Sequence, residues 1–294
     1  MDEQQFHIHC ILCGSTNIFN LPDYTKTGLL QCRECGFTFC KKIPTEKELR
    51  ENYRGYDRKR KISPITIGRY HEWLDMFEGY RKNNRILEVG CGSGHFLYEA
   101  KNRGWDVLGI EFDEDAVSLC KDKGIDAFQG TLSQLEKTQN KFDVIVCVEV
   151  IEHLMNLQAD FTKIGELARG DGALFITTPN FNSITRVVLK ENWECIAYPE
   201  HLNYFTQRTL TNFLKTNGFG ILEMTSTGIS PTRLKQFFFK QKVNRQTISH
   251  SDEGLRLKTE TNSFFKYVKA AINGLLTLIK GGDTIKCLAI KKSS

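Results

Sequence analysis

A glycine-rich segment that follows a short apolar run constrains this chain more than any other stretch. Residues 85–89 are mostly apolar and carry the acid Glu88, and glycines follow at the alternate positions 90, 92 and 94. Glycines spaced in this way let the backbone turn tightly after a strand and approach a ligand that a side chain would exclude. The segment therefore predicts a strand, a ligand-binding turn and a helix in succession.

Two neighbouring side chains narrow the kind of ligand. A dinucleotide fingerprint carries glycine or alanine three residues after its second glycine, where this chain has His95. A pyrophosphate at the N-terminus of the following helix would also be repelled by Glu88. A carboxylate instead suits a ligand that carries an ammonium or sulfonium group. The alternative is a glycine-rich turn in an α/β domain that binds no nucleotide.

Apolar segments alternate with helical patterns along the rest of the chain. This alternation predicts a parallel sheet with helices on both faces. The run at 141–148 is almost entirely apolar, as expected for a strand that is buried on both sides. We expect a helix over 94–103 and strands over 85–88, 105–111, 141–148 and 172–180, with a short third strand and its exit loop over 124–132.

The segment Glu88–Gly94 reads E-x-G-x-G-x-G and resembles motif I of the class I S-adenosylmethionine (SAM) methyltransferases. The resemblance covers roughly residues 80–294, in which residues 218–224 and 283–291 are similar to the final antiparallel strands of that family. It implies an α/β fold with a Rossmann-like seven-stranded sheet, and SAM as the cofactor.

The same resemblance implies a set of cofactor contacts. Glu111 lies 21 residues after Gly90, where an acid at the end of the second strand can accept hydrogen bonds from both ribose hydroxyls. Phe112 is expected to pack on the adenine. The remaining contacts are expected from the first strand, the glycine turn, the loop after the third strand and the end of the fourth, at Glu88, Gly90, Cys91, Gly92, Gly94, Thr131, Leu132 and Glu149.

Two C-x-x-C pairs near the start of the chain predict a metal site. Cys10 and Cys13 are separated by 18 residues from Cys32 and Cys35, and each pair is followed by glycine. Four thiolates at this spacing are typical of a structural Zn²⁺ site with no open coordination position. A redox pair or free core cysteines are the alternatives. We expect a small zinc ribbon over residues 1–44.

A helical linker is expected between the ribbon and the methyltransferase domain, over residues 45–80. Thr45 and Glu48 have the spacing of a capping box. An alternative hypothesis makes Tyr53 and Tyr56 part of a lid that faces the substrate. Large side chains at helical spacing, expected to pack the ribbon against the domain at 81–294, follow at Tyr70, Trp73, Leu74 and Phe77.

Candidate catalytic groups follow the fourth and fifth strands. Glu149, Glu152 and His153 form E-x-x-E-H, and His201 lies further along the chain. His153 is a candidate general base because its ordinary pKa is near neutrality. The same groups could bind a divalent cation that lowers the pKa of a hydroxyl acceptor. The pattern is similar to that of ubiquinone-biosynthesis O-methyltransferases, and to small-RNA 2′-O-methyltransferases, in which two glutamates and two histidines hold a divalent metal.

The organisation as a whole resembles bacterial methyltransferases of glycan and secondary-metabolite pathways that begin with a zinc ribbon. We expect SAM-dependent O-methylation of a small-molecule, lipid-linked or glycan acceptor, with Glu152, His153 and His201 as the catalytic residues. One alternative is an RNA 2′-O-methyltransferase, although no recognisable RNA-binding module is present and nucleic acid is not the expected partner. Another is a non-catalytic SAM-binding scaffold that contacts partners through the ribbon.

Charge is unevenly distributed along the chain. Residues 62–230 carry 16 basic and 23 acidic side chains, whereas residues 231–294 carry 13 basic and 4 acidic ones. The basic part includes an expected insertion over 230–282. Within it, residues 262–280 form a helix candidate that is apolar nearly all round. A lid, a homodimer contact and a peripheral membrane contact are open alternatives for this helix.

The expected compartment is the cytoplasm. The chain begins with an acidic and polar segment over residues 1–5, which lacks the pattern of a secretory signal. The ten cysteines of such a chain are expected to be reduced thiols, some of them bound to metal.

Overall fold

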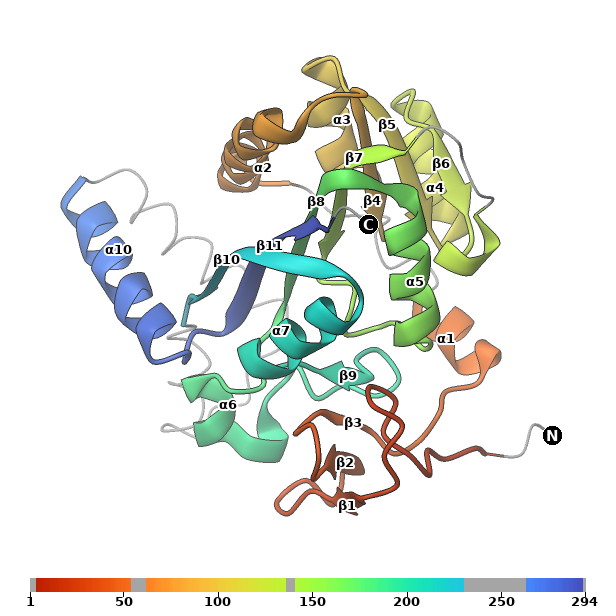
Figure 1. Cartoon of the computed structure of the whole chain (residues 1–294), viewed down its shortest axis with the longest axis vertical. Helices are drawn as coiled ribbons and strands as arrows, with labels where there is room; N and C mark the ends of the chain where they lie inside the picture. The colour runs from red at the N-terminus through yellow and green to blue at the C-terminus, as the bar shows by residue number, and fades with distance from the viewer. Residues whose placement is uncertain (1–3, 54–61, 136–140, 230–262, 293–294) are drawn as a thin grey trace.

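Figure 1 shows the computed structural model, which describes residues 4–53, 62–135, 141–229 and 263–292. Its strands form one sheet of four and one sheet of seven. The smaller sheet and its surroundings contain β1 (Ile18–Asn20), β2 (Leu29–Cys32), β3 (Thr38–Cys40), α1 (Glu46–Tyr53) and β9 (Asn203–Tyr204).

The larger sheet is surrounded by helices. Its strands are β4 (Arg85–Val89), β5 (Asp106–Glu111), β6 (Ala127–Gln129), β7 (Phe142–Val148), β8 (Ala168–Pro179), β10 (Phe219–Thr227) and β11 (Thr284–Lys291). The α-helices are α2 (Pro64–Phe77), α3 (His95–Asn102), α4 (Glu114–Asp122), α5 (Leu157–Leu167), α6 (Ile184–Leu189), α7 (Gln207–Thr216) and α10 (Ser263–Leu278). Short 3-10 helices are η1 (Glu78–Tyr80), η2 (Leu132–Gln134) and η3 (Lys190–Asn192).

The strand order of the larger sheet reverses next to β4, which is where a ligand-binding crevice is expected. The order is β10-β11-β8-β7-β4-β5-β6, with parallel pairing from β8 to β6 and antiparallel pairing of β11 with both of its neighbours. The chain runs outward from β4 through β5 to β6 and then returns to β7 on the other side of β4. Ligands bind at such a reversal, outside the carboxyl ends of the strands. The expected seven-stranded α/β sheet is confirmed.

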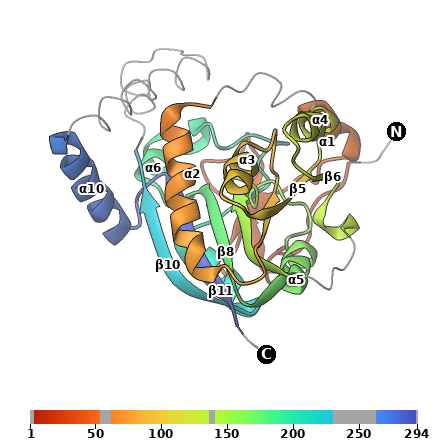
Figure 2. The same cartoon turned by 90° about the horizontal axis from the view of Figure 1, so that it is seen from above.

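Alternating side chains divide the core between the two faces of this sheet. Ile86 packs in one cluster with α2 and α3, while its neighbour Leu87 packs in another with α5 and α7. Successive residues of a strand point to opposite faces, so a strand buried on both sides must be apolar throughout. Figure 2 shows α2 and α3 side by side over the same face.

The N-terminal module, residues 4–53 with β1, β2, β3 and α1, shares its four-stranded sheet with the larger domain. β9 pairs with β3 in an antiparallel register that aligns Thr38 with Tyr204, and Phe37 and Phe39 pack in the same core cluster as α7. The four large side chains expected to join the ribbon to the next domain do not do so. Tyr70, Trp73, Leu74 and Phe77 pack with the sheet, because α2 is one of its covering helices.

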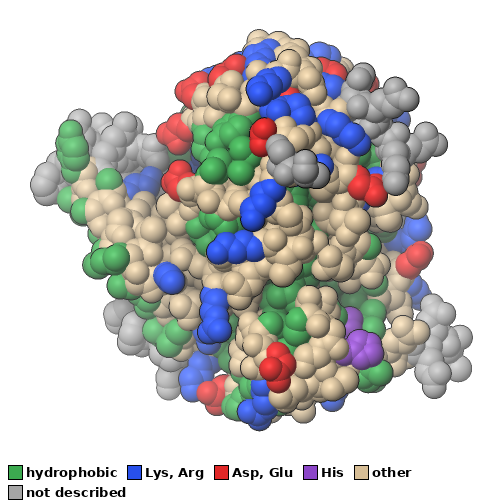
Figure 3. All heavy atoms as spheres, viewed as in Figure 1, with side chains coloured by type: hydrophobic (Ala, Val, Ile, Leu, Met, Phe, Trp, Pro, Cys, Tyr) green, Lys and Arg blue, Asp and Glu red, His purple; other side chains and the backbone are tan. Residues whose placement is uncertain are grey.

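The helix α10 presents an apolar face to solvent. Tyr267, Ile272, Leu275 and Leu278 are each about half exposed or more, whereas Leu276 is buried. Figure 3 shows apolar side chains on this part of the surface. A lid, homodimer or membrane contact of residues 262–280, as expected from the sequence, would use this face. Residues 230–262 of the expected insertion lie outside the described residues. In the described part of the chain, no helix is long and apolar enough to cross a membrane.

A buried carboxylate, that of Asp143, anchors the start of β4. It accepts hydrogen bonds from the backbone N–H groups of Lys82 (2.9 Å) and Asn83 (2.6 Å) and from Nε of Arg169 (2.8 Å). Burial acts to raise its pKa, but these hydrogen bonds outweigh burial and hold the pKa below its ordinary value. Asp143 therefore stabilises the fold above the ordinary pKa of aspartate, and this stabilisation is lost as the pH falls through the lower folded-state pKa.

We expect Asp143→Asn to lower the free energy of unfolding by ~3 kcal/mol at neutral pH, because it leaves Arg169 without its charged partner. Asp106→Asn is the matched control. Asp106 pairs with Arg85 at 2.9 Å but its side chain is 62% exposed, so the loss should stay below ~1 kcal/mol. Urea unfolding at neutral and acidic pH measures both. Equal losses in the two variants would contradict the anchoring role.

Candidate active site

The glycine turn lies at the carboxyl end of β4, in the crevice. Gly90, Gly92 and Gly94 have φ values of 68°, 51° and 73°, in the left-handed region that side chains disfavour. The N–H groups of Gly90 and Cys91 both donate to the carbonyl of Ile110, at 2.7 and 3.1 Å. The turn is therefore tied to the neighbouring strand β5.

Close packing adds a second reason for glycine in this turn. A Cβ atom at Gly90 would lie 2.6 Å from Cγ2 of Val150, and one at Gly94 would lie 2.8 Å from Sγ of Cys120. The side chain of Cys91 is buried beneath the turn, with its Sγ 3.9 Å from that of Cys120. Cys91 can therefore line the crevice only through its backbone.

Glu111 ends β5 directly beside the glycine turn. Its Oε2 accepts a hydrogen bond from the N–H of Gly92 at 2.8 Å, and its Oε1 accepts one from Phe112 at 2.7 Å. The ring of Phe112 lies 6.3 Å from that of Tyr53 and beneath the guanidinium of Arg50. The structure thus brings the expected ribose-binding and adenine-binding residues together with the turn.

The remaining expected cofactor residues differ in their exposure. Glu88 is 7% exposed within β4 and Leu132 is 2% exposed, packed in the core with Val89 and Ile110. Thr131 is on the surface and caps η2. Leu132 therefore faces the interior, and only its backbone can reach a ligand in the crevice.

The E-x-x-E-H segment forms a turn at the carboxyl end of β7. Glu149 has a φ of 54°, and its Oε1 accepts a hydrogen bond from the Thr177 hydroxyl at 2.8 Å. Glu152 is 1% exposed, and its Oε2 accepts a hydrogen bond from the Thr178 hydroxyl at 2.9 Å. Burial raises the pKa of Glu152 to about 8. Its Oε1 is buried without a hydrogen bond and lies 3.8 Å from Nε2 of His153.

The two candidate histidines lie against each other. Nδ1 of His153 is 2.6 Å from the carbonyl oxygen of Glu200, and Nδ1 of His201 is 2.7 Å from that of Cys195. Each Nδ1 therefore carries a proton, because a carbonyl oxygen only accepts. The ring centroids are 4.8 Å apart, and burial lowers the pKa of His153. One ligand atom each from Glu152, His153 and His201 lie within 4.8 Å of one another.

Asn203 attaches the loop that carries His201 to the E-x-x-E-H turn. This residue was not among those predicted for the site. Nδ2 of Asn203 donates to the carbonyls of Ile151 (3.1 Å) and Leu154 (2.6 Å). The N–H of Leu202 also donates to the carbonyl of Glu152, at 2.7 Å. Thr178 was likewise missed, although its place at the end of a buried strand next to the expected site could have indicated it.

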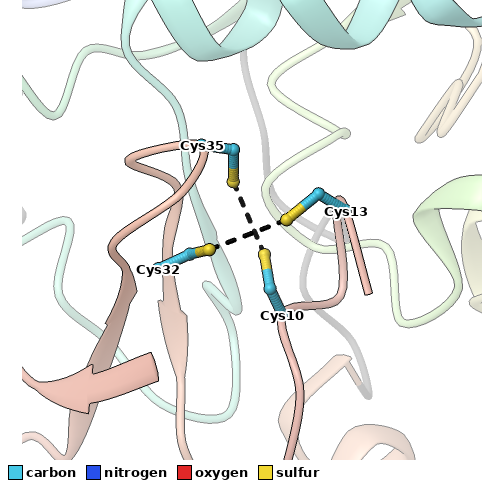
Figure 4. A group of neighbouring side chains, drawn as sticks. All are labelled: Cys10, Cys13, Cys32 and Cys35. Carbon is cyan, nitrogen blue, oxygen red and sulfur yellow. Dashed lines mark hydrogen bonds between the residues drawn. The ribbon is translucent and has the colours of Figure 1, made fainter. Parts of the chain in front are cut away.

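The four N-terminal cysteines converge in the small module (Figure 4). The Sγ atoms of Cys10 and Cys35 are 3.6 Å apart, as are those of Cys13 and Cys32. All four lie within 4.8 Å of one another. Tetrahedral Zn²⁺ with bonds of about 2.3 Å to sulfur separates its ligands by about 3.8 Å. The cluster therefore fits a zinc ion.

Two matching turns shape this cluster. Gly14 and Gly36 have φ values of 74° and 76°, and their N–H groups donate to the carbonyls of Cys10 and Cys32. Burial acts against ionisation of Cys32, but the backbone N–H groups of Cys35 and Glu34 bring its pKa below the ordinary value. A thiolate is the form that binds a metal.

Residues 56–224, more than half of the chain, match the family model described as "Methyltransferase domain". The chain belongs to this methyltransferase family. Together with the fold, the match makes the chain a class I SAM-dependent methyltransferase, and SAM is its cofactor. The matched residues include the glycine turn, Glu111, the E-x-x-E-H turn and His201.

Curated relatives of this methyltransferase include several called ubiquinone biosynthesis O-methyltransferase. The one from Rickettsia canadensis is 29% identical over 200 residues, which are 65% of this chain and 82% of the relative. The one from Azoarcus sp. is 28% identical over 128 residues, or 41% of this chain, and the match spans about half of that relative (53%).

Solved structures show the same fold at low sequence identity. A SAM-dependent methyltransferase from Archaeoglobus fulgidus has a TM-score of 0.52 and 19% identity, covering 84% of this chain and 100% of that one. Magnesium protoporphyrin IX methyltransferase from Synechocystis, solved with bound SAH, has a TM-score of 0.52 and 13% identity, with the same coverage.

Proposed function

We propose that this methyltransferase transfers a methyl group from SAM to a hydroxyl oxygen of a small-molecule, lipid-linked or glycan acceptor. The observation that carries the proposal is the cluster of Glu152, His153 and His201 at the carboxyl edge of the sheet, next to the glycine turn. Relatives named as O-methyltransferases support an oxygen acceptor. SAM, when bound, supplies an already activated methyl group, so the protein needs to orient an acceptor and remove one proton.

His153 is the proposed general base. Its Nδ1–H is held by the Glu200 carbonyl, so Nε2 is the nitrogen that can accept a proton. The lowered pKa of His153 keeps the ring neutral at pH 7 and ready to accept a proton. Oε1 of Glu152 lies 3.8 Å from Nε2 and its Oε2 is held by Thr178, so the ionised form of Glu152 would stabilise the imidazolium that forms.

A divalent cation at the same cluster is a second candidate, and one feature favours it. A histidine that binds a metal through one nitrogen almost always donates its other N–H to a carbonyl or carboxylate. His153 and His201 both have this arrangement, and Oε1 of Glu152 is a buried acceptor without a hydrogen bond. Glu152, His153 and His201 would hold the ion, which would lower the pKa of an acceptor hydroxyl.

We also propose that Cys10, Cys13, Cys32 and Cys35 hold a structural Zn²⁺ ion. Their four sulfurs fit its tetrahedral geometry and leave no open position for catalysis. The ion would stabilise the module that pairs with β9, and β9 follows the His201 loop directly.

Substitution of either histidine tests the catalytic proposal. We expect His153→Ala and His201→Ala to lower turnover at least ~100-fold, because proton transfer contributes about 100- to 10,000-fold. SAM affinity should stay within about twofold, since the expected cofactor contacts are those of the glycine turn, Glu111 and Phe112. Turnover is measured with SAM labelled in its methyl group and a panel of phenolic, polyprenyl-linked and sugar acceptors. Affinity is measured by calorimetry.

The remaining hypotheses give different results in the same assays. Loss of turnover in EDTA and recovery with Mg²⁺ or Mn²⁺ would favour the cation over the base. Methylation of a small RNA, with affinity that falls steeply with salt, would favour the RNA 2′-O-methyltransferase. SAM binding without transfer to any acceptor would favour the non-catalytic scaffold.

A further inference from the structure

Tyr53, the last residue of α1, stands between the cofactor crevice and the candidate catalytic histidine. Its ring meets that of Phe112 edge-on at 6.3 Å and that of His153 edge-on at 6.0 Å. Its hydroxyl oxygen is 3.0 Å from Nδ1 of His153 and donates to the carbonyl of Glu200 at 3.4 Å. A residue from the N-terminal segment therefore touches both halves of the site.

The protons of this network can be placed in one way. The carbonyl of Glu200 only accepts, so Nδ1 of His153, at 2.6 Å, must be the donor. The hydroxyl of Tyr53 then accepts a second hydrogen bond from the same Nδ1–H and donates its own O–H to the backbone carbonyl of Glu200. The network closes only when His153 is protonated on Nδ1, which leaves Nε2 unprotonated and directed toward Glu152.

The base of α1 is held firmly enough to place Tyr53. Thr45 and Glu48 form the expected capping box, with the Thr45 N–H donating to Glu48 at 2.9 Å. Glu48 also accepts from Lys42 at 2.6 Å and from the hydroxyl of Tyr198 at 3.1 Å. The ion pair with Lys42 holds the pKa of Glu48 at about 2, so this anchor stays charged at neutral pH.

The loop on the other side of Tyr53 is attached to the same N-terminal module. The N–H of Cys40 donates to the carbonyl of Leu202 at 2.9 Å, and its thiol donates to that of His201 at 3.3 Å. Tyr198 is bound by Glu48, as described above. The helix that carries Tyr53 and the loop that carries Glu200 and His201 are thus fixed to one framework.

We infer that Tyr53 is a positioning residue for His153, supplied by the N-terminal module. Tyr53 holds the ring of His153 so that the unprotonated Nε2 faces Glu152. Either proposed role of His153, as base or as metal ligand, requires this tautomer and orientation. The consequence for turnover rests on the proposed function, whereas the state of the His153 ring can be measured without any acceptor.

The test is Tyr53→Phe, which keeps the ring contact with Phe112 and removes only the hydroxyl. NMR of protein with ¹⁵N-labelled histidine detects the Nδ1–H of His153, assigned by its loss in His153→Ala. We expect its exchange with solvent to accelerate at least ~5-fold, the equivalent of one neutral hydrogen bond. Turnover should fall about 5- to 10-fold, while SAM affinity stays within about twofold.

Two further variants separate the role of the Tyr53 hydroxyl from that of its ring and from the general effect of removing a hydroxyl. Tyr53→Ala also removes the ring contact with Phe112, so it should weaken SAM binding in addition to turnover. Tyr267→Phe is the matched control, since Tyr267 is 77% exposed on α10 and should leave every readout unchanged. An unchanged exchange rate of the Nδ1–H in Tyr53→Phe would overturn the inference, as would unchanged turnover. If the wild-type protein methylates no acceptor but Tyr53→Phe accelerates exchange, the positioning stands and the proposed function fails.

Discussion

Replacing Gly90 with alanine should lower SAM affinity roughly 100-fold. A side chain in the left-handed region costs about 1–2 kcal/mol, and φ at Gly90 is 68°. The added Cβ would also lie 2.6 Å from Cγ2 of Val150, and such overpacking costs about 1–3 kcal/mol. The turn can relieve the strain and the clash only by leaving its left-handed conformation, the one expected to contact the cofactor. Calorimetric titration with SAM measures the effect.

Two controls show whether the effect belongs to the turn. Gly68 lies in α2 and has open space around its Cα, so Gly68→Ala should leave SAM binding unchanged and stabilise the protein by about 0.5–1 kcal/mol. Adding Val150→Ala to Gly90→Ala should restore part of the affinity, because it removes the clash but not the backbone strain. Wild-type affinity in Gly90→Ala would exclude the turn as the cofactor site.

Replacing Cys32 with serine should release zinc and unfold the N-terminal module. Cys32 is 1% exposed, 3.6 Å from the sulfur of Cys13, and a hydroxyl cannot replace the thiolate. Structural zinc sites contribute folding free energy directly, so a loss of several kcal/mol is expected. Zinc content by mass spectrometry and thermal unfolding measure the change.

Cys195→Ser is the matched control for zinc binding. Cys195 is half-buried and lies outside the four-cysteine cluster, so this variant should keep one zinc per chain. Because β3 pairs with β9, loss of zinc in Cys32→Ser should also reduce turnover without abolishing SAM binding. Stoichiometric zinc in Cys32→Ser would exclude the four-thiolate site.

Most of the larger sheet could be predicted from the sequence because its strands are buried on both faces. The runs at 85–88 and 141–148 correspond to β4 and β7 within one residue at each end. The family resemblance indicated the final antiparallel pair, β10 and β11. The packing partner of α2 could not be predicted. The apolar face of a helix indicates that it packs against another element, but it does not identify that element. The aromatics of α2 pack on the sheet and not on the ribbon.

The candidate site was predicted only in part, for a similar reason. His153 and His201 are candidates by residue type, but they are 48 positions apart, so the sequence does not indicate that their rings lie together. Asn203 and Thr178 act through hydrogen bonds to groups far along the chain, and such pairings have no local pattern. Leu132 was expected near the cofactor by its position, but its side chain is apolar and packs in the core.

The sequence by itself determined the elements whose causes are local. The left-handed glycine turn, the two cysteine knuckles and the apolar strands each arise from residues close together in the chain. Only the tertiary structure decided that β9 joins the N-terminal sheet and that Tyr53 reaches His153 across 100 residues. Backbone pairing and side-chain hydrogen bonds between distant segments depend on how the whole core packs. The joining of the N-terminal module to the candidate active site therefore appears only in three dimensions.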